Sequence, residues 1–526
     1  MSRKQRIVIS ITGIVLVMLI LVGLTYAYFL TRINGNTNDK SISVSTANLE
    51  LKYDDIEQVL ISEENVEPGK TWTKKFSATN TGSKKVESYG IALENVINTL
   101  ERTEDLVYTL NCTSSLGTDC NKVEDEQEFP TMGKILITNS IESKEIQSYE
   151  LTITYKEQNI DQSIDMNKQF SAKANLVNPS TFNPYVGSML NSVIIGSAKN
   201  ASKESDTTRT TLGSEVTEFT SVSGENERVL NNAPDDYGTS YYYRGNVLDN
   251  YVSFANKTWR IVRINGDGSV RLVLDDVAKD TSGNVLRTAF NSSSNDNAYV
   301  GYMYGTVGST TYDATHKNIN DSIIKTKVDK WYEDNLKKNY ANYLSDTLFC
   351  NDKTLASSSI GENNTALGYG KNKTYYSSTE RLQYSTGTTR ITTSKPTFKC
   401  SENATNTYSR FTVNETTLLN GNKTNGDLKY PIGLLSADEV AYAGAYKSGY
   451  LYDSSITSHW WLSSPRDYNG SLAHEWFVVY SNGIINDIVV SNTSLVAFRP
   501  SLSLKASVLI NGGDGTSSNP YTVKLS

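Results

Sequence analysis

The chain has 526 residues, which is more than one hydrophobic core holds and predicts two or three domains. Its formal net charge is −7 and it has no basic stripe, which argues against nucleic acid as a partner. Hydrophobic residues make up 38% of the sequence, enough for folded domains but not for a set of membrane spans.

The first predicted element is an apolar segment at residues 7–30, IVISITGIVLVMLILVGLTYAYFL, which contains no charged residue. Roughly 20 apolar residues span a bilayer core, whereas a buried core helix of this length would normally show a polar face. Basic residues directly before the segment should stay in the cytoplasm and place the rest of the chain outside: Arg3, Lys4 and Arg6. A small-x-small pattern also predicts signal-peptidase cleavage between Ala27 and Tyr28. Residues 1–30 are therefore either a signal peptide or a membrane anchor helix, and this alternative stays open.

Residues 31–178 have the pattern of an antiparallel β-sandwich. Short stretches that alternate between polar and apolar residues recur, such as residues 42–45 (ISVS), 49–52 (LELK) and 149–155 (YELTITY). Turn signals, including Pro68-Gly69, separate these stretches. Many short strands divided by turns are typical of a sandwich.

The four cysteines predict two disulfides, because an even number of cysteines in an exported chain usually forms a disulfide framework. Pairing by neighbourhood joins Cys112 to Cys120 and Cys350 to Cys400. The chain-entropy estimate gives about 2.6 and about 4 kcal/mol for these two loops. A zinc site is the weaker interpretation, since no Cys-x2-Cys or paired histidine spacing accompanies them.

Three motifs of the first third of the chain carry a resemblance to a known family. The stretch GLTYAYF, then STANLELKY, then VEPGKTWTKKFSATNTGS resembles the TasA/camelysin family of exported Gram-positive proteins. The resemblance implies an unusual signal peptide followed by a jelly-roll-like β-sandwich. Some family members are subunits of biofilm-matrix fibres. Camelysin itself has been called a metalloprotease, but this chain has no His-Glu-x-x-His motif to support that activity.

Residues 179–235 are rich in Pro, Ser, Thr, Asn and Gly, which predicts a polar linker with a short helix at 186–197. Residues 236–526 then combine strand and helix signals and predict an α+β domain. Its first element is a hairpin around the Asn-Gly-Asp-Gly stretch at 265–268, which is a tight-turn signal rather than a calcium loop.

Two helices are expected in this second domain. Apolar residues at helical spacing predict one over residues 323–344, with Asp321 or Ser322 as its cap. Ser436 followed by Glu439 is a capping-box pattern at the start of the other. Strands follow to the end of the sequence.

Four motifs in order carry a second resemblance. WRIVRINGDGSVRL, LLSADEVAYAG, WWLSSP and FRPSLSL are similar to bacterial surface domains related to the C-type-lectin-like fold of formylglycine-generating enzymes. The resemblance implies that a Trp-rich strand and a terminal strand with an Arg lie close together. It implies no activity here, because the cysteines match no catalytic motif and the Glu-Pro-Asn loop of the calcium-binding lectins is missing.

Seven residues form the candidate ligand-binding set: Trp460, Trp461, Arg466, His474, Glu475, Trp476 and Arg499. One interpretation is a recognition face on which aromatic rings stack on a sugar or peptide. The other places the tryptophans in the core and the arginines in buried ion pairs, and it is favoured because large aromatics are mostly core components. Trp460 and Trp461 point to opposite faces of a strand, so one of them should be covered by a loop or exposed.

Other polar groups are weaker candidates. His459, His474 and Glu475 have a mixed spacing that is a weak metal signal, so no metal and no cofactor is expected. The paired carboxylates Asp235-Asp236 and Asp275-Asp276 are interpreted as a solvated edge, because glycosidase chemistry needs carboxylates that face each other across a cleft.

The sequence as a whole indicates a β-rich, multidomain protein of the bacterial cell surface, with the bulk of the chain extracellular. The expected role is non-catalytic: adhesion, ligand display or matrix assembly. Expected partners are the membrane, through the N-terminal helix, then a glycan or protein at the cell surface and further copies of the chain. The alternative is a cell-envelope hydrolase, which clustered carboxylates or histidines in a deep pocket would favour.

Overall fold

The structure, a computed structural model, describes residues 42–43, 50–55, 61–64, 66–98, 100–166, 168–216, 227–357, 367–382, 395–400, 407–444 and 449–525. The chain divides into two compact units, Met1–Pro184 and Tyr185–Ser526. The apolar segment at 7–30 and the predicted cleavage site at Ala27 and Tyr28 lie outside the described residues. Among the residues that are described, no helix has the length and apolar character needed to cross a membrane.

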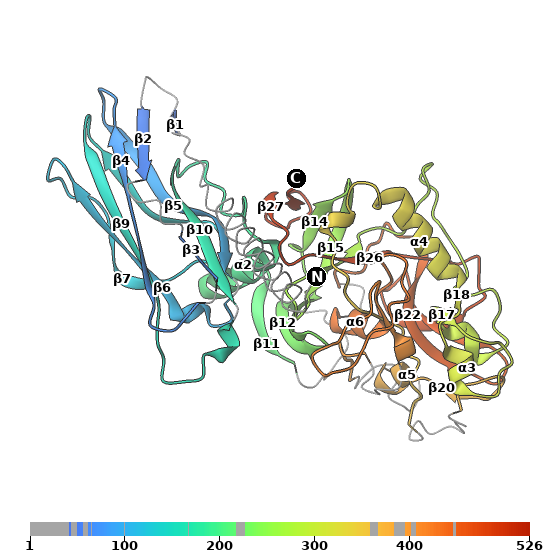
Figure 1. The fold of residues 1–526 in the computed structure, drawn as a ribbon. Helices are drawn as coiled ribbons and strands as arrows, with labels where there is room; N and C mark the ends of the chain where they lie inside the picture. The colour runs from blue at the N-terminus through green and yellow to red at the C-terminus, as the bar shows by residue number, and fades with distance from the viewer. Residues whose placement is uncertain are drawn as a thin grey trace, which may run out of the picture. The chain divides into compact units, whose positions relative to one another are not determined.

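The first unit is an antiparallel sandwich of two sheets, drawn in blue to cyan in Figure 1. One sheet has the order β1-β2-β4-β9-β6-β7 and the other β3-β10-β5-β8. Their bounds are β1 Ile42–Ser43, β2 Glu50–Asp55, β3 Ile61–Glu64, β4 Thr71–Asn80, β5 Val86–Asn98, β6 Leu106–Ser114, β7 Val123–Glu128, β8 Lys134–Ile141, β9 Ile146–Tyr155 and β10 Gln169–Val177. Two 3-10 turns, η1 Thr103–Asp105 and η2 Ser163–Asp165, complete the unit.

Alternation in the sequence explains the sandwich. In β9, IQSYELTITY, every second side chain is buried, so Leu151 and Ile153 enter the core while their neighbours face outward. Phe76 and Leu151 from one sheet share a buried cluster with Ile91 and Phe170 from the other. The predicted β-sandwich is therefore confirmed, and so is the Cys112–Cys120 disulfide, which the structure forms between the end of β6 and the loop before β7.

The second unit contains a nine-stranded sheet with the order β11-β12-β13-β15-β14-β28-β27, to which β16 is added beside β15 and β26 beside β16. The bounds are β11 Thr211–Glu215, β12 Arg228–Asp235, β13 Gly238–Gly245, β14 Tyr251–Phe254, β15 Lys257–Ile264, β16 Val270–Leu274, β26 Ser501–Leu504, β27 Ile510–Gly512 and β28 Tyr521–Val523. The predicted hairpin is confirmed as β15 and β16, and Gly268 supplies the left-handed φ of +80° in its turn.

A five-stranded sheet forms the second layer, with the order β20-β22-β23-β24 and β25 beside β22. Its strands are β20 Thr374–Tyr375, β22 His459–Tyr468, β23 Ala473–Val478, β24 Ile485–Val489 and β25 Val496–Ala497. Two short pairs are β17 Met303–Tyr304 with β18 Asn320–Asp321, and β19 Phe349–Cys350 with β21 Arg410–Phe411. The helices are α2 Leu190–Glu204, α3 Tyr312–His316, α4 Ile323–Asn335, α5 Ser377–Leu382 and α6 Ala437–Tyr442, with 3-10 turns η3 Asn297–Val300, η4 Ala341–Tyr343 and η5 Thr407–Ser409.

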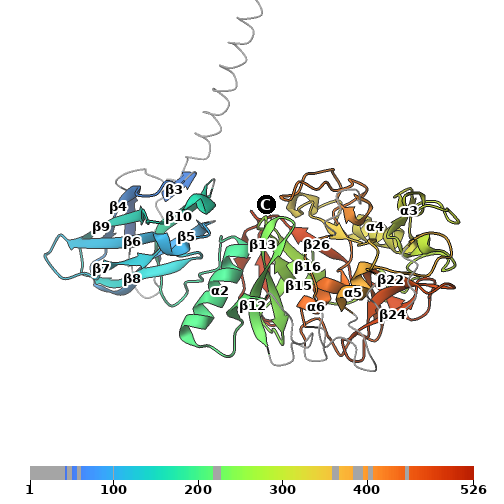
Figure 2. The same cartoon turned by 90° about the horizontal axis from the view of Figure 1, so that it is seen from below.

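Side-chain caps set the starts of the two predicted helices. The Ser322 hydroxyl accepts from the Lys325 N–H at the start of α4, and Ser436 with Glu439 forms the complete capping box of α6. Helix α4 ends at Asn335 rather than at 344, because Leu336 leaves the helical conformation and the chain continues into η4. Helix α6 packs against both β13 and β22, and Figure 2 shows it between the two larger sheets.

The interpretation of residues 179–235 as a polar linker needs correction. From Tyr185 on they belong to the second unit, where α2 packs against β11 and β12. Figure 2 shows α2 beside β12, which is paired along its whole length with β13. Their polar composition suits strands that gain their stability from ladder hydrogen bonds and from the covering helix.

The first and last stretches of the second unit pair with each other. The Gly187 N–H donates to the Ile510 carbonyl at 2.7 Å, and the Ile510 N–H donates back to Ser188 at 3.0 Å. Strand β28 lies parallel to β14 in the nine-stranded sheet. The sheet is thus completed by residues from both ends of the unit.

Candidate functional site

The predicted aromatic residues are part of the core of the five-stranded sheet. Trp460, Trp461 and Trp476 are each at most 2% exposed. The Trp461 indole N–H donates to the Thr288 carbonyl at 2.8 Å, and the Trp476 indole N–H donates to the Ser378 hydroxyl at 3.0 Å. The structure therefore does not form the exposed aromatic face, because both sides of β22 are covered by other parts of the chain.

Arg499 is buried and holds backbone segments of the second unit together. It is 1% exposed, lies 4.9 Å from the ring centre of Trp460 and donates to three backbone carbonyls. These belong to Leu274 at 2.8 Å, Leu451 at 2.8 Å and Asp275 at 3.1 Å. The Trp-rich strand and the terminal arginine do lie together, as expected. The guanidinium, however, binds backbone carbonyls of the chain itself and not solvent.

The antiparallel register of β22 and β23 brings Arg466 and His474 to one small charged cluster. His474 Nδ1 lies 2.7 Å from Asp467 Oδ1, and Arg466 pairs with Asp467 and with Asp487. Burial lowers the pKa of His474. These two predicted residues meet through Asp467, and both are only half-buried.

Glu475, the remaining predicted residue, points into the interior. It is fully buried, and neither carboxylate oxygen has a hydrogen-bond partner. Burial raises the pKa of Glu475 well above its ordinary value. Ligand binding by the seven residues stays a prediction, but a ligand in solvent cannot reach Glu475 in this conformation.

A polar cavity lies elsewhere in the second unit, where β12 and β13 meet α6 and the disulfide. Its volume of about 20 Å³ holds roughly one water molecule. Five carboxylates line it: Asp235, Asp236, Asp352, Asp438 and Glu439. Asp235 and Asp236 are 5% and 3% exposed, so their interpretation as a solvated edge is wrong. The turn that holds them is buried because partners distant in sequence close over it.

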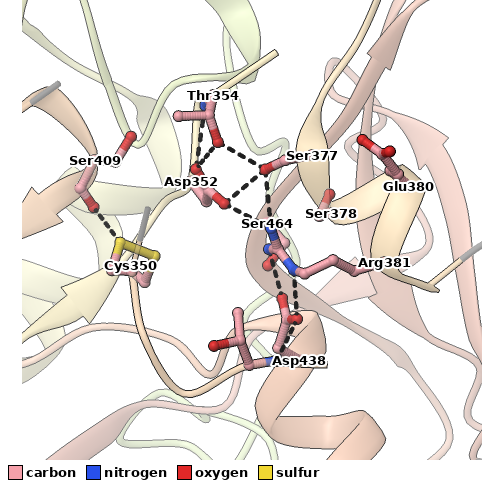
Figure 3. A network of polar contacts seen from close by, with 12 residues as sticks. Cys350, Asp352, Thr354, Ser377, Ser378, Glu380, Arg381, Ser409, Asp438 and Ser464 are labelled. Carbon is pink, nitrogen blue, oxygen red and sulfur yellow. Dashed lines mark hydrogen bonds and ion pairs between the residues drawn. A yellow bond between two sulfur atoms is a disulfide. The ribbon is translucent and has the colours of Figure 1, made fainter. Parts of the chain in front are cut away.

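One arginine pairs with two of these carboxylates, as Figure 3 shows. Arg381 on α5 binds Asp438 bidentately at 2.8 and 2.9 Å and Asp352 at 2.9 Å. Burial acts to raise the pKa of Asp352, but Arg381 and the hydroxyls of Ser377 and Thr354 outweigh it and lower the pKa. Asp352 is therefore charged, and both carboxylates are paired with Arg381.

A second arginine pairs with two more carboxylates. Arg263 on β15 lies 2.8 Å from Asp235 and 3.2 Å from Glu439. Arg271 on β16 lies 3.6 Å from the same Glu439 oxygen, and burial lowers the pKa of Arg271 to about 10. These contacts join the nine-stranded sheet to α6.

Asp236 differs from the other four carboxylates. Its Oδ2 accepts the Cys400 N–H at 2.8 Å, whereas its Oδ1 is buried without a hydrogen-bond partner. Burial raises the pKa of Asp236 to about 6. A carboxyl that titrates near neutral pH can take up or release a proton, which is the property required of a general acid or base.

The cavity also contacts the second predicted disulfide. Cys350 lines the cavity and is joined to Cys400, which confirms the predicted pair. Among the described residues, no group of three His, Cys, Asp or Glu side chains is arranged to hold a metal ion. Of the cavity residues, the sequence indicates the Asp235-Asp236 pair, Cys350 as a disulfide partner, and Ser436 with Glu439 as a capping box. Asp352, Arg381 and Asp438 carry no shared motif, because they meet only through tertiary packing.

Comparison with known proteins supports the first resemblance. The family model of camelysin metallo-endopeptidase matches residues 2–191, which include the whole sandwich. No curated protein matches the chain. A solved structure described as "AvmM Catalyzes Macrocyclization in Alchivemycin A Biosynthesis" covers 28% of this chain and 100% of its own at 10% identity. Its TM-score is 0.15, so it carries no argument about fold or function.

Proposed function

We propose that the protein is exported to the Gram-positive cell surface and has a non-catalytic role in adhesion, ligand display or matrix assembly. The observation that carries the proposal is the camelysin-family match over residues 2–191, which covers the apolar N-terminal segment and the β-sandwich together. Two disulfides support it, since such bonds persist in oxidising surroundings outside the cytoplasm. Either the N-terminal segment anchors the chain in the membrane or it is removed after Ala27.

Within this proposal the second unit is the ligand-recognition part and belongs to the lectin-like surface domains that its motifs resemble. The interior of the unit contains ion pairs, such as those of Arg381, and hydrogen bonds from side chains to backbone carbonyls, such as those of Arg499. Such contacts favour a rigid scaffold whose ligands are proteins, glycans or further copies of the chain bound at its surface.

One observation favours the second candidate, a cell-envelope hydrolase acting on glycan or peptide. Asp236 combines a raised pKa with an unpartnered oxygen in a cavity lined by carboxylates. A cavity of about 20 Å³ does not admit a sugar ring or a peptide, however, so hydrolysis would need the surrounding loops to open. We therefore place the hydrolase second.

Two measurements test the proposal. Expressed in a Gram-positive host, the full chain should be cut by protease added to intact cells, and protection from that protease would contradict surface exposure. The purified full chain should bind members of a glycan or peptide array without forming product. Product formation that is lost in Asp236→Asn would replace the binding role with the hydrolase.

A further inference from the structure

A lysine, an asparagine and an aspartate meet in the second unit, away from the carboxylate cavity. Lys353 follows β19, Asn318 lies between α3 and β18, and Asp427 lies between β21 and α6. The Lys353 Nζ lies 2.9 Å from Asn318 Oδ1, and the Asn318 Nδ2 donates to Asp427 Oδ2, also at 2.9 Å. The side-chain amide is thus held at its oxygen by the amine and at its nitrogen by the carboxylate.

The Lys353 amine lies in the protein interior, where its Nζ also donates to the Met303 carbonyl at 3.0 Å and to the His316 carbonyl at 3.3 Å. Lys353 is fully buried, with its Nζ near Phe411 and its backbone N–H donating to Ser409. Burial lowers the pKa of Lys353 to about 7, against the opposing effect of Asp427 and Glu475. A large share of this side chain is therefore the neutral amine at neutral pH.

The distance to the electrophilic carbon is short. The amide carbon is bonded to Oδ1 at about 1.2 Å, so Nζ lies within about 4 Å of it. Reacting atoms in a near-attack geometry are about 3–3.5 Å apart, so a small side-chain rotation is enough. Holding the two reacting groups in contact replaces a high concentration of either one.

We propose that Lys353 and Asn318 form an intramolecular isopeptide bond. The neutral Lys353 amine attacks the side-chain carbonyl carbon of Asn318, and a new C–N bond forms. The Asp427 carboxylate accepts the proton that the amine loses and passes it to Nδ2. The old C–N bond then breaks, ammonia leaves, and the carboxylate is returned unchanged. No oxidant, reductant or cofactor is needed.

Peptide mapping of the reduced, denatured full chain tests the bond directly. A branched peptide should join the segments that contain residues 318 and 353, its mass lower by one ammonia than the sum of the two. Trypsin should fail to cut after Lys353 but should cut after Lys325, which is equally buried and pairs with Asp321 and Asp329 instead of an amide. Linear peptides only, with position 318 either unchanged or deamidated, would overturn the proposal.

Variants separate the reaction from folding. Asn318→Ala should restore cleavage after Lys353, and Asp427→Ala should lower the cross-linked fraction at least about tenfold, since both reactants remain but proton transfer is lost. Glu415→Gln is the matched control: this exposed carboxylate lies between β21 and α6 like Asp427 but pairs with Lys423. An unchanged cross-linked fraction in Asp427→Ala would remove Asp427 from the mechanism.

Discussion

The unpartnered carboxyl of Asp236 should make the second unit sensitive to pH in the mildly acidic range. We expect Asp236→Asn to remove this sensitivity and to stabilise the protein at neutral pH. The asparagine oxygen can still accept the Cys400 N–H that Asp236 accepts now. The substitution therefore removes the charge while keeping the hydrogen bond.

The magnitude follows from the shift in pKa. Burial moves the carboxyl from an ordinary value of 3.8 to about 6, and one pKa unit corresponds to about 1.4 kcal/mol. Below pH 3.8 the carboxyl is protonated in both the folded and the unfolded protein. Above pH 3.8 the carboxyl ionises in the unfolded protein but stays protonated in the folded one. The free energy of unfolding of the wild type therefore falls with rising pH until the folded carboxyl also ionises near pH 6. The wild type should lose about 3 kcal/mol relative to Asp236→Asn across this range.

Urea denaturation from about pH 4 to about pH 7, read from the tryptophans of the second unit, measures the difference. Asp313→Asn, at an exposed position in the first turn of α3, controls for the change in net charge. If the free energies of unfolding of wild type and Asp236→Asn stay parallel over this pH range, then Asp236 does not ionise in a buried environment and the reasoning fails.

Two further changes test the surroundings of the cavity. Replacing both Cys350 and Cys400 by Ala opens a 50-residue loop and should lower the free energy of unfolding by about 4 kcal/mol. The melting temperature of the second unit should fall. An unchanged melting temperature would show that the disulfide does not constrain the unfolded chain. Arg381→Met leaves Asp352 and Asp438 buried without their cation and should cost about 3–5 kcal/mol in urea denaturation. A loss below about 1 kcal/mol would mean that water already screens the pair.

Local patterns in the sequence were sufficient for much of the fold. The alternation in β9, the capping box at Ser436 and the neighbouring cysteines each depend on residues close together in the chain, so their consequences could be predicted. Strand β12, RVLNNAPD, cannot be recognised from the sequence, because its polar residues are typical of a linker and only the pairing with β13 makes them a strand.

The candidate site could be predicted only in part, for a related reason. Trp460 and Trp461 do alternate along a strand, but both faces of that strand are covered, which alternation alone cannot show. Asp235 and Asp236 are a visible pair in the sequence, but Arg263 and Glu439 reach the same place from distant segments. Burial and partners are properties of the packed chain, and no spacing rule encodes them.

The pairing of the two ends of the second unit has a consequence for the order in which the protein is made. Strand β28 cannot join β14, nor can Ile510 bond to Gly187, until residues 510–523 have been synthesised. Contacts so distant in sequence form late and slowly. Under the proposed export, the second unit therefore crosses the membrane unfolded and closes only after strand β28 has been delivered.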